Sequence, residues 1–158
     1  GKIILNGKGD RYRPVGKDYG QRFDKIFKRR DLVKLACECA RLSLEYVEYG
    51  RKQPLNAIET AEAWLRNEAT VEEVKAAAIK SAHLACDIGC SAFCETASSA
   101  YNAAHTVYAD DPLDSAQRAI DSACFANRKK TLRKCEKIAK KYRIRIDYEP
   151  IRLRRVNK

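Results

Sequence analysis

Apolar residues recur at helical spacing along most of the chain, and the longest such stretch runs from Thr70 to Tyr108. Thr70 and Glu73 have the spacing of a capping box, which predicts a helix start. The obligately polar residues of the stretch occur every three, four or seven positions: Lys80, Asp87, Ser91, Glu95, Ser98, Asn102 and Thr106. This spacing keeps one edge of a helix exposed to solvent, while small and apolar residues occupy the other sides. We expect a long Ala-rich central helix enclosed by other helices, with a bend or break near Gly89 because one straight helix would exceed a compact domain.

Shorter helical periodicities flank this stretch. They predict helices over 31–50, 54–65 and 111–124, and the last periodicity continues to residue 142 with a basic outer side. Ala, Leu, Glu, Lys and Arg dominate the composition, while Gly and Pro are scarce, as is typical of all-α proteins. At 158 residues the chain fits one domain. We therefore expect an all-α bundle of four to five helices around the central one.

The two ends of the chain have a different pattern. From Arg143 onward apolar and charged residues alternate, which indicates a strand, and residues 2–5 are a further strand candidate. Two alternatives remain open: the ends pair in a minor sheet of two or three strands, or they are arms that stay disordered until a partner binds. The expected divisions are a basic N-terminal arm with a short amphipathic turn (1–30), a helical domain (31–142) and a basic C-terminal arm or strand (143–158).

The net charge of +11 is concentrated at the two ends. Residues 1–30 carry a net charge of +7 and residues 128–158 carry +11, whereas the segment between them carries −7. Basic segments flanking an acidic helical body indicate arms that contact a polyanion or an acidic protein, and solubilising tails are the simpler alternative. Some cations alternate with tyrosine, which suits phosphate contacts and base stacking. The predicted binding residues are Arg11, Tyr12, Arg13, Arg128, Lys129, Lys130, Arg133, Lys134, Lys137, Arg143, Arg145, Arg152, Arg154 and Arg155.

Cysteine usage and hydropathy bear on the compartment. The seven cysteines are an odd number and most lie among alanines in predicted helices, which favours buried thiols in a reducing compartment over a disulfide framework. No run of apolar residues is long enough for a membrane span, and the chain opens without the pattern of a secretory leader. We expect a soluble, intracellular protein with no membrane contact.

Candidate catalytic and metal-binding groups are sparse. Four potential ligands share one side of the predicted central helix: His83, Cys86, Cys90 and Cys94. Groups spread over several turns of one helix cannot converge on one zinc ion, so core packing is the favoured interpretation. Cys37 and Cys39 point about 200° apart on a helix and cannot chelate together. His105 is far from His83 along the same helix, and no hydrolase, metalloprotease or nucleotide-binding motif is present. We predict no catalytic residue, no metal site and no cofactor.

Two segments near the N-terminus, "GKGDRYRPV" and "YGQRFDKIF", resemble small uncharacterised proteins of tailed bacteriophages. In those proteins a Lys-Gly-Asp, Arg-Pro opening precedes a Phe/Trp-Asp-x-Ile-Phe element. The resemblance implies a phage source rather than a mechanism.

Residues 54–85, "PLNAIETAEAWLRNEATVEEVKAAAIKSAHLA", resemble the immunity-protein family of bacterial polymorphic toxin systems, which also occurs in phage genomes. Members carry Pro, Ala-Ile, Ala-x-x-Trp, and Gly-Glu-x-Thr with a later Glu before a long Ala-rich helix. Asn67 stands where Gly is usual. The matching positions here are Pro54, Ala57, Ile58, Ala61, Trp64, Glu68, Thr70 and Glu73. The resemblance implies an all-helical protein that binds and neutralises another protein and has no catalytic residues.

Together these observations predict a non-catalytic, phage-encoded interaction protein in the cytoplasm of a bacterial host cell. Its expected partner is a protein or nucleoprotein of the host, of a defence system or of a toxin system, which it modulates or neutralises. The alternative is a sequence-tolerant binder of DNA or RNA that uses the basic arms. The net charge of +11 argues against a basic nuclease as the target, unless the acidic body makes the contact.

Overall fold

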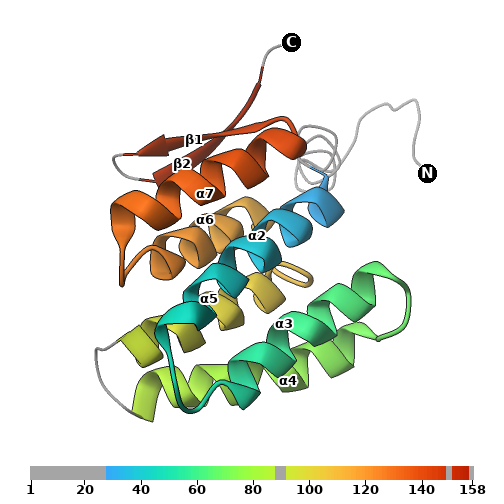
Figure 1. The fold of residues 1–158 in the computed structure, drawn as a ribbon. Coiled ribbons are helices and arrows are strands. Elements are labelled where there is room, and N and C mark those ends of the chain that lie inside the picture. Colours follow the sequence, from blue (N-terminus) through green and yellow to red (C-terminus); the bar gives the residue numbers. More distant parts are fainter. Residues whose placement is uncertain (1–27, 88–91, 149–150, 157–158) are drawn as a thin grey trace, which may run out of the picture.

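The computed structural model describes residues 28–87, 92–148 and 151–156. These residues form six α-helices, a short 3-10 turn and two strands (Figure 1). The elements in chain order are α2 (Arg29–Ser43), η1 (Leu44–Tyr46), α3 (Lys52–Leu65), α4 (Val71–Asp87), α5 (Ala92–His105), α6 (Pro112–Ala123), α7 (Arg128–Lys141), β1 (Ile144–Tyr148) and β2 (Ile151–Arg155). The prediction of an all-α fold with a minor sheet is confirmed.

The stretch predicted as one long helix is a pair of helices, α4 and α5, that fold back on each other. The Ser81 hydroxyl donates a hydrogen bond to the Ala97 carbonyl at 2.7 Å, and the Cys94 thiol donates to the Ala85 carbonyl at 2.7 Å. Pairing of residue 81 with 97 and of residue 85 with 94 fixes an antiparallel arrangement. The expected break near Gly89 is confirmed, and it raises the helix number above the predicted four to five.

Only the second half of this stretch is central. The alanines of α5 that face α2, α3 and α6 are fully buried: Ala97, Ala100, Ala103 and Ala104. Thr106, expected on a wet edge, is also buried. On α4, by contrast, Val74, Ala78 and Ser81 are buried, whereas Ile79 is 50% exposed. The prediction that the whole stretch is enclosed is therefore wrong for α4, because only one side of that helix has partners.

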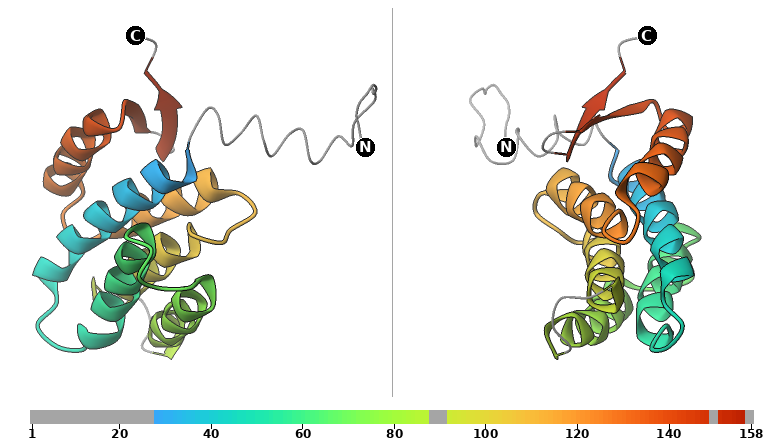
Figure 2. Two further views of the ribbon diagram at one scale, coloured as in Figure 1. Left: turned by 90° about the vertical axis from the view of Figure 1, so that its right-hand side faces the viewer. Right: turned by 60° about the vertical axis from the view of Figure 1, so that its left-hand side comes forward.

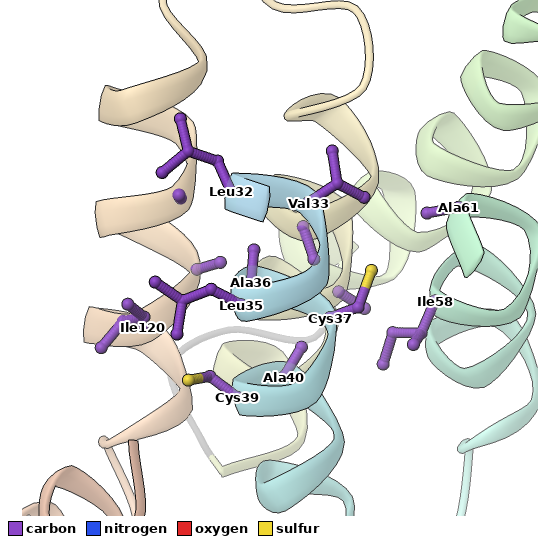
Figure 3. Packing of buried hydrophobic residues seen from close by; sticks show 14 of the residues in the cluster. Leu32, Val33, Leu35, Ala36, Cys37, Cys39, Ala40, Ile58, Ala61 and Ile120 are labelled. Carbon is purple, nitrogen blue, oxygen red and sulfur yellow. The ribbon is translucent and has the colours of Figure 1, made fainter. Parts of the chain in front are cut away.

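The second central helix is α2, which is buried on more than one side (Figure 3). Leu35 and Cys39 point toward Ile120 of α6, while Cys37 points toward Ile58 of α3. The prediction that the two cysteines diverge is confirmed. Figure 1 shows α2 running through the middle of the molecule between the layer of α3 and α4 and the layer of α6 and α7.

Hydroxyl groups join the closely packed helices. The Ser99 hydroxyl of α5 donates to the Ala119 carbonyl of α6 at 2.7 Å, and the Thr96 hydroxyl donates to the Ser43 carbonyl of α2 at 3.2 Å. Such side-chain to backbone bonds between helices require that small residues occupy the contact, because larger ones would hold the backbones apart. Buried polar groups are thereby paired, which avoids a desolvation cost.

Arg29, the first residue of α2, closes the end of α5. Its guanidinium donates to the carbonyls of Thr106, Val107 and Ala109 at 2.9, 3.2 and 2.9 Å. These carbonyls lie in the turn just after α5, at the partly negative end of the helix, so the partly buried guanidinium both pairs with them and balances that charge.

The predicted helix over 31–50 is shorter than expected. α2 ends at Ser43, whose hydroxyl bonds back to the Ala40 carbonyl at 2.7 Å, and the chain tightens into η1 before it becomes extended at Val47. Gly50 then adopts a φ of 74°, and a Cβ added there would lie 2.2 Å from Cε1 of Phe93. Glycine is required at this position by both backbone conformation and space.

The capping box that predicted the start of α4 is confirmed. Thr70 and Glu73 exchange hydrogen bonds, with the Glu73 N–H donating to the Thr70 hydroxyl at 3.2 Å and the Thr70 N–H donating to the Glu73 carboxylate at 2.9 Å. Asp111 caps α6 by accepting from the Asp114 N–H at 3.1 Å. Asn127 caps α7, so the periodicity predicted to run on from 111–124 is divided between two helices.

The minor sheet is an antiparallel hairpin of β1 and β2 (Figure 2). Ile144, Ile146, Ile151 and Leu153 are buried, and the hairpin packs against α6 and α7. The Leu153 N–H donates to the Gln117 side chain of α6 at 2.9 Å. Both strands come from the C-terminal segment, while the strand candidate at residues 2–5 lies outside the described residues.

Ala97→Glu tests the placement of α5. Ala97 is fully buried, so a glutamate there would bury an unpaired carboxylate, and we expect a loss of about 3 kcal/mol in the free energy of unfolding, or failure to fold. The matched control is Ala76→Glu on the exposed side of α4, with an expected change within about 0.5 kcal/mol. Urea unfolding followed by circular dichroism measures both, and equal stability of the two variants would contradict this placement.

Asn67 offers a test of backbone strain at the end of α3. Its φ is 63°, and the N–H groups of Asn67 and Glu68 donate to the carbonyls of Trp64 and Ala63 at 3.0 and 2.8 Å, which is the Schellman arrangement. Glycine adopts this conformation without strain, and asparagine tolerates it better than most residues.

We expect Asn67→Ala to lower the free energy of unfolding by about 1 kcal/mol, because alanine would have to adopt the left-handed conformation, which it disfavours. Asn67→Gly should be at least as stable as the wild type. The urea midpoints of the two variants provide the measurement, and the reverse order of stability would refute the strain argument.

Candidate functional site

The predicted binding residues gather at one end of the molecule. Arg11, Tyr12 and Arg13 lie outside the described residues. The others occupy α7, the turn that follows it and the hairpin: Arg128, Lys129, Lys130, Arg133, Lys134, Lys137, Arg143, Arg145, Arg152, Arg154 and Arg155. All of these are exposed except Lys134, which is partly buried. In Figures 1 and 2, α7 and the hairpin lie together at the end opposite α3 and α4. We call this surface the cationic face.

On α7 the cations are placed by the amphipathic pattern. Leu132, Cys135 and Ala139 are buried against the body, which forces the Lys and Arg residues between them outward. Glu136 is the single acidic residue of this helix. The helix therefore presents a dense row of positive charge to solvent.

On the hairpin the same separation follows from the period of two. The inward residues are apolar, and the register places Arg145 opposite Arg154 and Asp147 opposite Arg152 on the outward side. Asp147 accepts a hydrogen bond from the Arg154 guanidinium. Three outward arginines thus surround one carboxylate.

In the described part of the chain, the ion pairs of α7 and the hairpin include Arg128–Asp121 at 3.2 Å, Lys134–Glu45 at 3.9 Å, Lys141–Glu38 at 2.6 Å and Arg154–Asp147. Their side chains are all substantially solvent-accessible, so each pair adds little stability and is screened by salt. Within the described part of the chain, no carboxylate pairs with Lys129, Lys130, Arg133, Lys137, Arg145 or Arg152. Most of the charge remains available to a partner.

Tyr142 does not supply an exposed aromatic surface for base stacking. It is partly buried, its hydroxyl donates to the Glu38 carboxylate, and the ammonium of Lys141 lies 5.6 Å from its ring centroid. Burial and the hydrogen bond to Glu38 raise the pKa of Tyr142 above its ordinary value. The described cationic face is therefore charged, but Tyr142 does not add the aromatic stacking surface that the sequence suggested.

An aromatic hollow lies just beyond the C-terminal end of α2. Its volume is about 400 Å³, and it is lined by Tyr46, Val47, Glu48, Tyr49, Gly50 and Phe93. Tyr49 falls within the helix predicted over 31–50, but it is 82% exposed because that helix ends earlier. A second hollow of about 440 Å³ lies between α3 and α4 and is lined by both alanines and polar side chains.

The potential metal ligands of the central stretch do not form a site in the described residues. His83 is exposed, and the Cys94 thiol is engaged with the Ala85 carbonyl. Cys86 and Cys90 have no described side chains. No group of three or more histidine, cysteine or carboxylate side chains in the described part of the chain is arranged to hold a metal ion.

Three buried cysteines meet where α2, α6 and α7 converge, which sequence reasoning missed. Cys135 lies within interaction range of both Cys124 and Cys39, and all three side chains are fully buried. The hydrogen bond with Cys135 and burial raise the pKa of Cys124, so the thiol stays protonated and unreactive. Cys37 has its pKa raised by burial in the same way. These thiols act as small core residues.

A histidine–serine pair was also missed. Nδ1 of His105 lies 2.8 Å from the Ser115 hydroxyl, and the imidazole stacks on Tyr101 with a centroid distance of 5.4 Å. The turn between α5 and α6 brings the two residues together, although no motif spacing signals it. A nucleophile must be reached by substrate, and Ser115 is only 3% exposed. The pair instead holds the end of α5 against α6.

A family comparison identifies the scaffold. The model of the Imm-5 like putative immunity protein family matches residues 25–140. The chain belongs to this family. The match spans all of the described helices except the last residue of α7, and the hairpin lies beyond it. No curated protein and no solved structure shows significant similarity to the chain.

The residues that carry the family resemblance are structural. Ala57, Ile58 and Ala61 are fully buried on α3, and Trp64 packs under the guanidinium of Arg30 at 5.1 Å from its centroid. Asn67 occupies the left-handed position that explains why glycine is usual there.

None of the helices in the described part of the chain has the length and apolar character that a membrane span needs.

His105 provides a pH test of the α5–α6 contact. Burial lowers the pKa of His105 below its ordinary 6.5, with Asp110 and Asp114 opposing the shift in part. The unfolded chain then binds the proton more tightly than the folded one, so the contribution of His105 is complete above about pH 6.5 and is lost as pH falls through its folded pKa.

We expect the free energy of unfolding to fall between about pH 7.5 and about pH 5.5, and His105→Gln to reduce that fall. Urea titrations at the two pH values measure the difference. His83→Gln, at an exposed histidine, is the control and should keep the wild-type pH dependence. Identical pH dependence in wild type and His105→Gln would show that the contact does not perturb the imidazole.

Proposed function

We propose that the protein is a non-catalytic immunity protein, which neutralises a toxin protein by binding it stoichiometrically. The observation that carries the proposal is the family match over residues 25–140, which covers nearly the whole helical body. The resemblance of the N-terminal segments to tailed-phage proteins supports a phage source, with action in the cytoplasm of the bacterial host.

The chemistry of the described surface supports binding over catalysis. The histidine–serine pair is closed to substrate by the burial of Ser115, and the raised pKa of Cys124 keeps that thiol protonated. What the surface offers in abundance is exposed charge. Exposed charge speeds association and selects partners, and both suit a protein that must capture a toxin before it acts.

Sequence-tolerant binding of DNA or RNA is the second candidate, and the cationic face is the observation that favours it. Positive charge that is not paired with carboxylates releases counterions from a nucleic-acid backbone, which drives binding regardless of sequence. The same face would contact the acidic surface of a protein, so an experiment must separate the two.

Affinity capture from bacterial lysate, with and without nuclease treatment, makes that separation. The full-length chain is the bait, and an unrelated protein of similar net positive charge is the control. We expect one protein to be retained in equal amount with the bait after nuclease treatment, and to be absent from the control. Co-expression of the chain with that protein should restore growth that the protein alone inhibits.

Loss of all retained material after nuclease treatment would contradict the immunity proposal and favour nucleic-acid binding. Gel-shift assays would then show an affinity for generic duplex DNA that falls linearly with salt on logarithmic axes. A retained protein that does not inhibit growth would also contradict neutralisation.

A further inference from the structure

We propose that the outward side of the β1–β2 hairpin docks on an acidic surface of the toxin protein and helps to select that toxin. This hairpin face consists of Arg145, Arg152 and Arg154 around Asp147. The proposal rests on the immunity function and assigns the surface and the chemistry of its partner.

The hairpin face is formed before any partner binds. The inward residues Ile144, Ile146, Ile151 and Leu153 are buried against α6 and α7, and the Leu153 N–H is fixed by the Gln117 side chain at 2.9 Å. Rigid strands hold the three arginines in register, so docking does not require the segment to fold. An arm that ordered only on contact would lose part of its binding energy to that ordering.

Helix α7, beside the hairpin, carries further exposed cations. That helix packs directly beside β1, and its exposed residues include Arg133 and Lys137 (Figures 1 and 2). A surface of this kind is complementary to a cluster of glutamates and aspartates, and it is repelled by a basic one. The toxin surface that meets it is therefore acidic, which the net charge of +11 also favours.

Two features favour a protein over nucleic acid as the partner. Asp147 lies among the arginines and Glu136 among the lysines of α7, where a protein partner can pair each carboxylate with a cation of its own, whereas a phosphate backbone carries no cation. Tyr142 is engaged with Glu38 and cannot stack on a base. The outward cations of the hairpin are all arginine, whose planar fork bonds a carboxylate bidentately, as it also does a phosphate, and fixes its orientation. A mixed but mainly positive surface fits a protein with the opposite mixture.

The position of the hairpin in the chain supports a role in selecting the toxin. The family match ends at residue 140, so the hairpin adds charge to a helical scaffold that the match covers almost completely. Recognition residues that are set on a rigid scaffold can vary without unfolding it.

The test compares two triple variants of the full-length chain. R145Q/R152Q/R154Q removes the arginines of the hairpin face, and R51Q/K52Q/K80Q removes the same amount of charge from exposed residues of α3 and α4 and the residue before α3. Circular dichroism and thermal melting establish that both variants are folded. Fluorescence anisotropy then measures binding to labelled poly-L-glutamate and to a labelled duplex DNA at near-physiological salt.

We expect the hairpin variant to bind poly-L-glutamate at least about tenfold more weakly than wild type, and the control variant to lose less than about twofold. In the co-expression assay the hairpin variant should fail to neutralise the captured toxin, whereas the control should protect as the wild type does. Equal losses in the two variants would overturn the proposal, because net charge alone would then explain binding.

Other outcomes distinguish this proposal from the function on which it rests. Full neutralisation by the hairpin variant would overturn the docking surface and leave the immunity function intact. Failure of the wild type to retain any toxin would overturn the immunity function itself. Tighter binding of duplex DNA than of poly-L-glutamate, lost in the hairpin variant alone, would assign the hairpin face to nucleic acid instead.

Discussion

The close approach of α2, α5 and α6 is the constraint on which the rest of the structure depends. Alanines occupy the contacts between these helices, among them Ala40, Ala100 and Ala119. Because the backbones come near, the Ser99 hydroxyl reaches a carbonyl of the neighbouring helix, and a buried polar group becomes a link between helices. Larger side chains at these contacts would separate the helices and strand the hydroxyl groups. The closely packed α2 and α6 also form the surface on which α7 and the hairpin pack.

Local signals in the sequence predicted much of this fold, and long-range contacts account for what they missed. The capping box of Thr70 and Glu73 and the alternating residues after Arg143 act over a few residues, and both formed as expected. The division of burial between α4 and α5 could not be read in the same way. Alanine is tolerated on either side of a helix, so an alanine-rich pattern does not say which helix is central.

The cationic face was also predictable in part, because local sequence patterns decide which charged residues are exposed. Charged residues at outward positions of an amphipathic helix are exposed whatever the tertiary arrangement, so the exposure of Arg133 and Lys137 follows from the pattern. That α7 and the hairpin lie side by side does not follow from it. Neither do the meeting of Cys39, Cys124 and Cys135 or the contact of His105 with Ser115, because each joins elements whose relative positions only the packed core determines.

The contact made by Arg29 has a consequence for how the chain folds during synthesis. Its guanidinium meets carbonyls that lie 77 to 80 residues further along the chain. The ribosome therefore releases α2, with its buried Leu32 and Leu35, well before α5 and α6 exist to cover it. Helix α2 must therefore stay partly uncovered, or be held by a chaperone, until the second half of the chain has emerged and the helical body can close.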